Sequence, residues 1–458
     1  GRLRHDQRID VTLVLSELAG RAVMADWQAW RRDPSLYLGP CLGGIFNLYL
    51  NRARPEPELA AAAVARLRQV PSVVAAARAN LDPAVAPRLL VERGVRQCRG
   101  GITYFRDLLA DEVRDERLRP EVGQAGADAA VAMEDLAAHL DALAGRARGD
   151  WALGETHYSA LLRDRELLGY GAAEMHAAGL VAWSELDEEM SELAERIDPA
   201  AGGWHATVMA LSAEHPGSPE EMRDAYQHAC RDARRFLQER GLVTLPDGEE
   251  CLVVPSPVFQ RPVLAVASYS LPPPFSASRT GHFFVPYPPE GTTDEQLDQR
   301  LSDNGYHAIP TVAVHEAYPG HHWQLTWSNQ TDRRVRHLAR RAYFVEGWAL
   351  YAEKMMREQG YFTDPRQELC HLDARILRAA RVVVDTALHT GEMTVEEAVE
   401  HMSTRASLSE AVARAEVDRY CAWPTQAPSY LTGSLEIERI RRRWETDPRR
   451  GLRAFHDT

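Results

Sequence analysis

The sequence has few cysteines, and no two of them lie close together. Its 458 residues include six, none of them in a Cys-x-x-Cys pair. They are Cys41, Cys98, Cys230, Cys251, Cys370 and Cys421. Scattered cysteines in a long chain indicate buried free thiols in a reducing compartment. This pattern argues against a disulfide framework and against a zinc site built from cysteines.

Long apolar runs and a surplus of positive charge are also missing. No apolar run approaches the ~20 residues of a membrane-spanning helix. Residues 1–30 lack a basic segment followed by an apolar stretch and a cleavage site, so we expect a cytoplasmic protein without a membrane segment. Because the sequence begins at Gly1, an earlier leader stays an open alternative. The net charge of −13, with no Lys/Arg stripe among aromatics, argues against a nucleic-acid partner.

Most of the chain has the periodicity of amphipathic helices. Apolar residues recur at steps of three and four from Ile9 to about Arg240, and again after Pro310. Residues 251–289 differ, because prolines separate short runs of Val, Leu, Phe and Tyr that predict brief strands. The strand HFFVPYP in this region is a candidate for pairing with an extended substrate at its edge, the alternative being a purely structural edge strand. The prediction is a mainly α fold with a small β element, with a helical lobe at 1–250 and a second lobe at 251–458.

The octapeptide HEAYPGHH, residues 315–322, contains three histidines and a glutamate. In the regular zinc helix the second histidine follows four residues after the first, but here that position is Pro319. His321 lies six residues after His315 and would point away from it on an ideal helix. Pro319 and Gly320 predict a local bulge or kink that brings the imidazoles together. The motif then resembles His-Glu-x-Gly-His of metallopeptidases with two residues inserted, which favours His321 as ligand and leaves His322 as the alternative.

A third ligand is expected from FVEGWALYAE, residues 344–353. Its Glu346 begins an amphipathic helix and lies 25 residues after His321. Two histidines and a glutamate leave one position of a tetrahedral zinc ion open. Glu353 lies too far along the same helix to share the ion, so we expect it to contact a ligand or to be solvated.

Several longer stretches resemble one known family. They are HEAYPGHHWQ, FVEGWALYAE, RAARVVVDTALH (378–389), PTQAPSYLTG (424–433) and ASYSLPPPFSASRTGHFFV (267–285). Together they resemble the bacterial "domain of unknown function 885" family, whose members are related to gluzincin metallopeptidases. The resemblance implies a gluzincin-like helical fold with a central cleft, and a metal site in the lobe 251–458. It also implies one zinc ion held by His315, His321 and Glu346, with Glu316 as general base.

Two further groups of side chains are candidates for the site. Arg378, Arg381, Asp385 and His389 can share one face of a helix, where an arginine would clamp a substrate carboxylate. We therefore expect Arg378, Arg381 and His389 to bind substrate, the alternative being a buried salt-bridged stripe between helices. Tyr430 lies in a turn and is a candidate for donating its hydroxyl to an oxyanion. The alternative for Tyr430 is packing against a helix.

These features predict a zinc-dependent hydrolase of a peptide or peptide-like amide. Zinc activates a water and Glu316 takes its proton, which is the usual chemistry of such sites. A small peptide or amide is the expected partner, and the oligomeric state stays open. One alternative keeps the metal but acts on a non-peptide small molecule in a biosynthetic pathway. Another is a catalytically silent binding protein on the same scaffold.

Overall fold

The computed structural model describes residues 3–257, 261, 266–272, 278–447 and 449–458. Contacts divide the chain into two compact units, Leu18–Ala160 and Gly1–Glu17 with Leu161–Thr458. The division differs from the boundary near residue 250 that the sequence predicts. The physical reason is that the helices between residues 161 and 240 pack on later helices of the larger unit, which their periodicity alone does not reveal.

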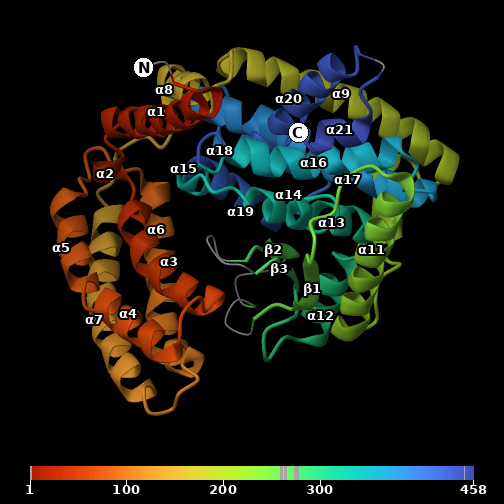
Figure 1. Ribbon diagram of the computed structural model, residues 1–458. Coiled ribbons are helices and arrows are strands. Elements are labelled where there is room, and N and C mark those ends of the chain that lie inside the picture. Colours follow the sequence, from red (N-terminus) through yellow and green to blue (C-terminus); the bar gives the residue numbers. More distant parts are fainter. Residues whose placement is uncertain (1–2, 258–260, 262–265, 273–277, 448) are drawn as a thin grey trace. The chain divides into compact units, whose positions relative to one another are not determined.

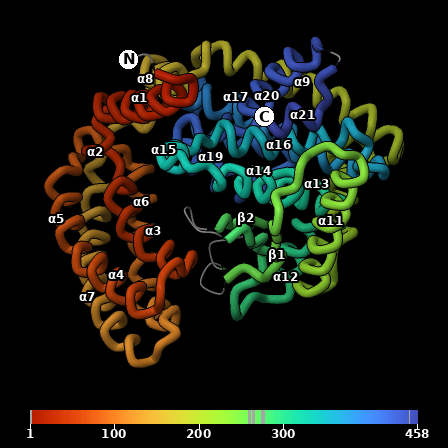
Figure 2. Tube along the Cα trace, viewed as in Figure 1, coloured from red at the N-terminus to blue at the C-terminus, as the bar shows by residue number. Residues whose placement is uncertain are grey.

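The smaller unit is a set of helices around one apolar core. Its helices α3 to α7 lie side by side (Figures 1 and 2). Helix α1 (His5–Asp26) begins in the larger unit and ends in this one. The other elements are α2 (Ala29–Arg32), α3 (Ser35–Asn51), α4 (Glu56–Leu67), α5 (Val70–Asn80), α6 (Arg88–Thr103), η1 (Tyr104–Leu108), η2 (Leu109–Glu112), α7 (Arg119–Ala144) and α8 (Gly154–Ala160).

One stretch of the smaller unit, residues 56–80, is long and apolar enough by length and composition to cross a membrane. In the structure it comprises α4 and α5, with a turn between them. Leu59, Val64, Leu67 and Val74 from this stretch are all buried in the core of the unit. Packing therefore accounts for its apolar composition, and the stretch is weak evidence for a membrane span.

The larger unit is mainly helical and carries the only strands among the described residues. Its helices are η3 (Leu161–Arg165), α9 (Ala172–Ile197), α10 (Trp204–Ser212), α11 (Pro219–Arg240), α12 (Asp294–Ser302), α13 (Ile309–Glu316), α14 (His321–Ser328), α15 (Arg334–Leu338), α16 (Ala342–Glu358), α17 (Pro365–Thr390), α18 (Val395–Arg405), α19 (Glu410–Ala422), α20 (Ser429–Trp444) and α21 (Leu452–His456). Helix α9 packs along α17, and α11 packs against α13.

Helix α17 has clear start and stop signals. Asp364 caps its N-terminus by accepting from the backbone N–H of Arg366, and Pro365 occupies the first turn. Gly391 ends the helix in the left-handed region at φ 81°. The result is one continuous helix whose buried face contacts α9, α13, α16 and α20.

Three strands form a small sheet in the order β1–β3–β2. They are β1 (Glu250–Pro255), β2 (Ser268–Ser270) and β3 (Thr280–Val285). Strand β3, which contains the HFFV run, pairs with β1 in parallel and with β2 in antiparallel. The expectation that this run offers a free edge to substrate is therefore wrong, because both its edges are already paired. The predicted strand region at 258–260 and 262–265, and the quoted stretch at 273–277, lie outside the described residues.

Helices α16 and α20 approach each other through glycines. A Cβ at Gly347 would lie 2.5 Å from Cα of Gly433, and a Cβ at Gly433 would overlap the carbonyl oxygen of Tyr343. No other residue type allows two helix backbones to come this close. The contact fixes the first turns of α16, which carry Glu346, against α20.

Candidate metal centre

The segment between His315 and His321 breaks the helix. Helix α13 ends at Glu316, Ala317 leaves helical geometry (φ −113°, ψ −83°), and α14 begins at His321. The Tyr318–Pro319 peptide bond is cis. Gly320 donates its N–H to the carbonyl oxygen of Val314 at 3.0 Å. The deformation that Pro319 and Gly320 predict is therefore present, as a break between two short helices.

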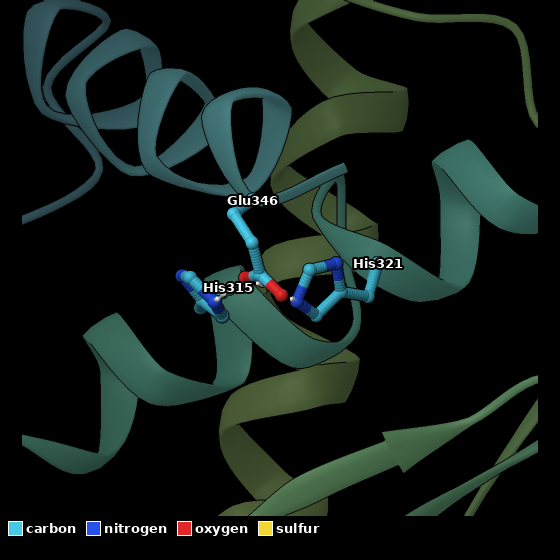
Figure 3. A group of neighbouring side chains, drawn as sticks. All are labelled: His315, His321 and Glu346. Carbon is cyan, nitrogen blue, oxygen red and sulfur yellow. Dashed lines mark ion pairs between the residues drawn. The ribbon is translucent and has the colours of Figure 1, made fainter. Parts of the chain in front are cut away.

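This break places the two imidazoles face to edge. The ring centroids of His315 and His321 lie 4.7 Å apart with an interplanar angle of 86°. Glu346 Oε2 lies 3.7 Å from Nε2 of His315 and 3.4 Å from Nε2 of His321. Figure 3 shows Glu346 reaching from α16 between the two rings. One ligand atom from each residue lies within 4.8 Å of the others, so the three residues could hold one metal ion.

The neighbouring His322 faces a different environment. Its Nε2 lies 2.7 Å from Oε2 of Glu249, and its Nδ1 lies 3.0 Å from the hydroxyl of Tyr269. The side chain is fully buried. Since both ring nitrogens are engaged, the structure places His321, and not His322, beside His315 and Glu346.

Glu353 lies two turns after Glu346 on α16 and contacts His315 from the other side. Its Oε1 is 2.6 Å from Nδ1 of His315, and its Oε2 is 3.5 Å from Nδ1 of His371. Glu353 and His371 are both fully buried. Of the two roles that the sequence left open for Glu353, contact with a candidate ligand is present and solvation is not.

Buried charges of opposite sign are strongly coupled in this group. Burial lowers the pKa of His315, but the carboxylates of Glu346 and Glu353 outweigh this and raise it to about 10. Burial raises the pKa of Glu346, but contacts with His315 and His321 bring it well below its usual range. The centre of the group is therefore a place where positive charge is favoured.

Glu316 follows His315 directly and ends α13. Burial raises the pKa of its carboxyl group, and the charges of His321 and His315 counteract the rise. The side chain is partly exposed and makes no hydrogen bond with a described residue. It thus lies beside the candidate ligands with its carboxylate uncommitted, as a general base requires.

The residues predicted on α17 have different surroundings. Arg381 donates to Glu416 Oε2 at 2.7 Å and to the Tyr420 hydroxyl at 3.1 Å, so it is part of a salt-bridged cluster. His389 is fully buried, with its Nε2 3.0 Å from the backbone oxygen of Tyr420. A substrate cannot reach His389 in this conformation, and the structure does not bring it to the candidate ligands. The alternative of a buried salt-bridged stripe between helices therefore describes Arg381 and His389 better than substrate binding does.

Arg378 and Tyr430 remain as candidates near the group. Nη1 of Arg378 donates to the carbonyl oxygen of Ala374, in its own helix, at 2.6 Å. Tyr430 lies in the first turn of α20, with its ring 6.0 Å from Cζ of Arg378 and 5.2 Å from Cζ of Arg381. Tyr430 therefore packs on the arginines, and its role towards an oxyanion stays a prediction.

Sequence reasoning missed several residues that support the group. Glu249 accepts from Tyr318 at 2.5 Å, from His322 and from Arg234, and so holds the broken segment against α11. Nδ1 of His371, on α17, lies 3.5 Å from Oε2 of Glu353 without a hydrogen bond. These side chains come from distant elements and share no spacing with the motif. His322 belongs to the HEAYPGHHWQ stretch, but nothing local in the sequence indicates that Glu249 is its partner.

The fold and this group of side chains define a mainly helical protein in which two histidines and a glutamate could hold one metal ion. The chain belongs to the family of bacterial proteins of unknown function DUF885, because the family model matches residues 2–458. A search of curated proteins finds no match.

Two solved structures are similar in fold. A candidate lipoprotein of unknown function from Shewanella oneidensis has a TM-score of 0.83 and 24% identity, covering 99% of this chain and 85% of that one. A candidate lipoprotein from Colwellia psychrerythraea has a TM-score of 0.73 and 22% identity, covering 87% of this chain and 72% of that one. At this identity the likeness shows the fold alone. The cytoplasmic location is not confirmed by these relatives and stays a prediction.

Proposed function

We propose that the protein is a zinc-dependent hydrolase of a peptide or peptide-like amide. The observation that carries the proposal is the convergence of His315, His321 and Glu346, whose ligand atoms lie within 4.8 Å of one another. They come from three helices, so their meeting is not a by-product of one helical face. We extend the proposal to the class of fold, a gluzincin-like arrangement with a substrate cleft at the metal centre.

The donor set fits zinc. Two imidazole nitrogens and one carboxylate oxygen are the ligands of many catalytic zinc sites, which keep one position open. The hydrogen bond from Nδ1 of His315 to Glu353 leaves Nε2 as the atom facing Glu346. Alkaline-earth ions prefer sites with oxygen ligands alone. The chemistry of these side chains therefore favours zinc over Mg²⁺ or Ca²⁺.

The roles of the chain's own residues follow from their positions. When bound, zinc polarises the scissile carbonyl and lowers the pKa of a water beside it. Glu316 takes one proton from the attacking water, whose oxygen bonds to the carbonyl carbon. As the C–N bond breaks, Glu316 passes that proton to the leaving amine. Buried Glu353 keeps His315 oriented and takes no part in proton transfer.

Metal analysis combined with a peptide digest tests the proposal. We expect one zinc per chain, and cleavage of a peptide library that stops when a chelator is added and returns with zinc. Glu316→Gln should keep the metal and lose turnover, whereas Glu346→Gln should lose both. Glu400→Gln, at an exposed position on α18, is the matched control and should lose neither. A chain that stays metal-free after zinc addition would contradict the proposal.

The same variants separate the alternatives. An enzyme acting on a non-peptide molecule would bind zinc and leave every peptide intact. For a binding protein without catalysis, the unsubstituted protein and the Glu316→Gln variant would give the same result in every assay. The uncommitted carboxylate of Glu316 beside the ligands favours catalysis, since metal binding alone does not require it.

A further inference from the structure

Three arginines follow one another at three-residue steps on α17. Arg375 donates to Glu438 at 2.9 Å, and Arg381 donates to Glu416 at 2.7 Å. Both guanidinium groups are therefore neutralised by carboxylates of the protein. Arg378, between them, forms no ion pair within 4.0 Å with a carboxylate of the described residues. Within the described part of the chain, it donates a hydrogen bond to a carbonyl oxygen of its own helix.

The side chain of Arg378 is half-buried, and its guanidinium is only partly satisfied. Its Nε is buried and has no hydrogen-bond partner in the described part of the chain. An arginine offers five N–H donors in a planar fork that matches a carboxylate. Desolvated donors without an acceptor are costly in a folded protein, and a ligand that supplies the acceptor removes that cost. Arg378 is thus suited to a carboxylate from outside the chain.

The position of Arg378 on α17 connects it with the proposed catalytic residues. His371, two turns before Arg378 on the same face of α17, lies 3.5 Å from Oε2 of Glu353, whose Oε1 is 2.6 Å from Nδ1 of the candidate ligand His315. Helix α17 also contacts α13 and α16, which carry Glu316 and Glu346. The ring of Tyr430 lies beside the guanidinium and supports its orientation. A carboxylate on Arg378 would therefore lie close to the bond attacked by the water that Glu316 activates.

We propose that Arg378 binds the free C-terminal carboxylate of a peptide substrate, so that the enzyme removes the last residue of short peptides. This inference rests on the proposed hydrolase function and specifies its substrate class. An acidic side chain offers the same chemical group, but the main-chain carboxylate is fixed one residue from the scissile amide. Water adds to the carbonyl carbon of the penultimate residue, and the terminal amino acid leaves with its amine protonated.

A set of three peptides tests the inference. They are an N-blocked tripeptide with a free carboxylate, its C-terminal amide, and the amide of the same peptide ending in Asp. We expect kcat/KM for the free acid to exceed that for both amides by at least tenfold. Equal cleavage of the free acid and the plain amide would overturn the inference and leave the hydrolase function standing. Preference for the Asp amide would assign Arg378 to a side chain and also overturn it. Cleavage of none would refute the hydrolase function itself.

Substitutions at Arg378 identify the residue responsible. Arg378→Gln should lower kcat/KM for the free acid about ten- to a hundredfold, as expected for a lost charge-assisted pair, and leave the amide unchanged. Arg378→Lys should recover part of the loss. Arg414→Gln, which removes an exposed cation on α19, is the control. An equal loss on acid and amide would show a structural role and contradict the inference.

A binding measurement gives a readout apart from turnover. In the zinc-loaded Glu316→Gln protein, the free acid should bind at least tenfold more tightly than its amide by calorimetry. Adding Arg378→Gln should abolish that difference while the zinc content stays the same. A difference that persists without Arg378 would assign the carboxylate to another residue and overturn the inference.

Discussion

Oε1 of Glu353 lies 2.6 Å from Nδ1 of His315, and both side chains are buried. A metal-binding histidine usually donates its second N–H to such an acceptor, which fixes the ring and its tautomer. Behind Glu353 lies His371 of α17, with its Nδ1 3.5 Å from Oε2 of Glu353.

We expect Glu353→Gln to weaken zinc binding about tenfold or more, because a neutral amide orients the imidazole less strongly than a carboxylate. Competition with a chromophoric chelator measures the dissociation constant. Glu358→Gln, one turn and a residue further along α16, provides a control on the same helix. An unchanged zinc affinity would show that Glu353 does not orient His315.

Substitutions of the adjacent His321 and His322 should affect different properties, zinc binding for the first and stability for the second. His321→Asn should abolish stoichiometric zinc binding. His322→Asn should keep the zinc but lower the free energy of unfolding by about 1–3 kcal/mol, because the buried carboxylate of Glu249 loses a partner. Zinc content and urea unfolding of the two variants check both outcomes. Loss of zinc in His322→Asn with normal folding would reverse the assignment.

The glycine contact between α16 and α20 should tolerate no side chain. Gly433→Ala should lower the free energy of unfolding by about 2 kcal/mol or more, because its Cβ would overlap the Tyr343 carbonyl. Gly100→Ala in α6 is the control, since a Cβ there meets nothing within 4 Å. That control should raise stability by roughly 0.5–1 kcal/mol. Equal effects of the two substitutions would mean that the helices separate easily.

Stability should fall in mild acid because of His456. Burial lowers the pKa of this histidine from 6.5 to about 4, and the charges of Arg441, Asp457 and Glu445 modify the shift. Its Nδ1 donates to the Leu242 oxygen at 2.8 Å, and its Nε2 accepts from the Tyr351 hydroxyl at 2.8 Å. Below pH 6.5 the unfolded chain binds a proton that the folded chain does not bind until about pH 4. The contribution to stability is therefore complete above pH 6.5 and disappears towards pH 4.

Urea unfolding of the metal-free protein at pH 7 and pH 5 measures this effect. His456→Asn should reduce the difference between the two free energies of unfolding by about 2 kcal/mol, which follows from the shift of the pKa. His228→Asn, at an exposed position on α11, is the control and should leave the difference unchanged. If both variants keep the wild-type difference, His456 is not the titrating group.

The sequence predicted the parts of this protein that depend on local chemistry. Pro319 and Gly320 predict the helix break, because proline has no backbone N–H to donate and glycine has no Cβ. Glu346 could be found because it follows the motif on a clearly amphipathic helix. The mainly helical fold and the short strands follow from periodicity and proline content in the same way.

Contacts between residues far apart in the chain could not be predicted from local sequence patterns. Glu249 meets His322 from 73 positions away in the chain, and His371 meets Glu353 across two helices. The pairing of β3 on both edges depends on strand order, which chain order does not fix. For the same reason the sequence predicts an arginine stripe on α17. It does not predict which of these arginines forms no ion pair with a carboxylate.

Gly320 has a consequence for recognising related proteins. A Cβ at this position would overlap the carbonyl oxygens of Val314 and His315, so bare backbone fills the space between the two candidate ligands. A sequence search that requires histidines one helical turn apart would pass over this chain. A search that instead requires a glycine immediately before the second histidine, and tolerates a variable insertion ahead of it, would detect distant homologues that share this geometry.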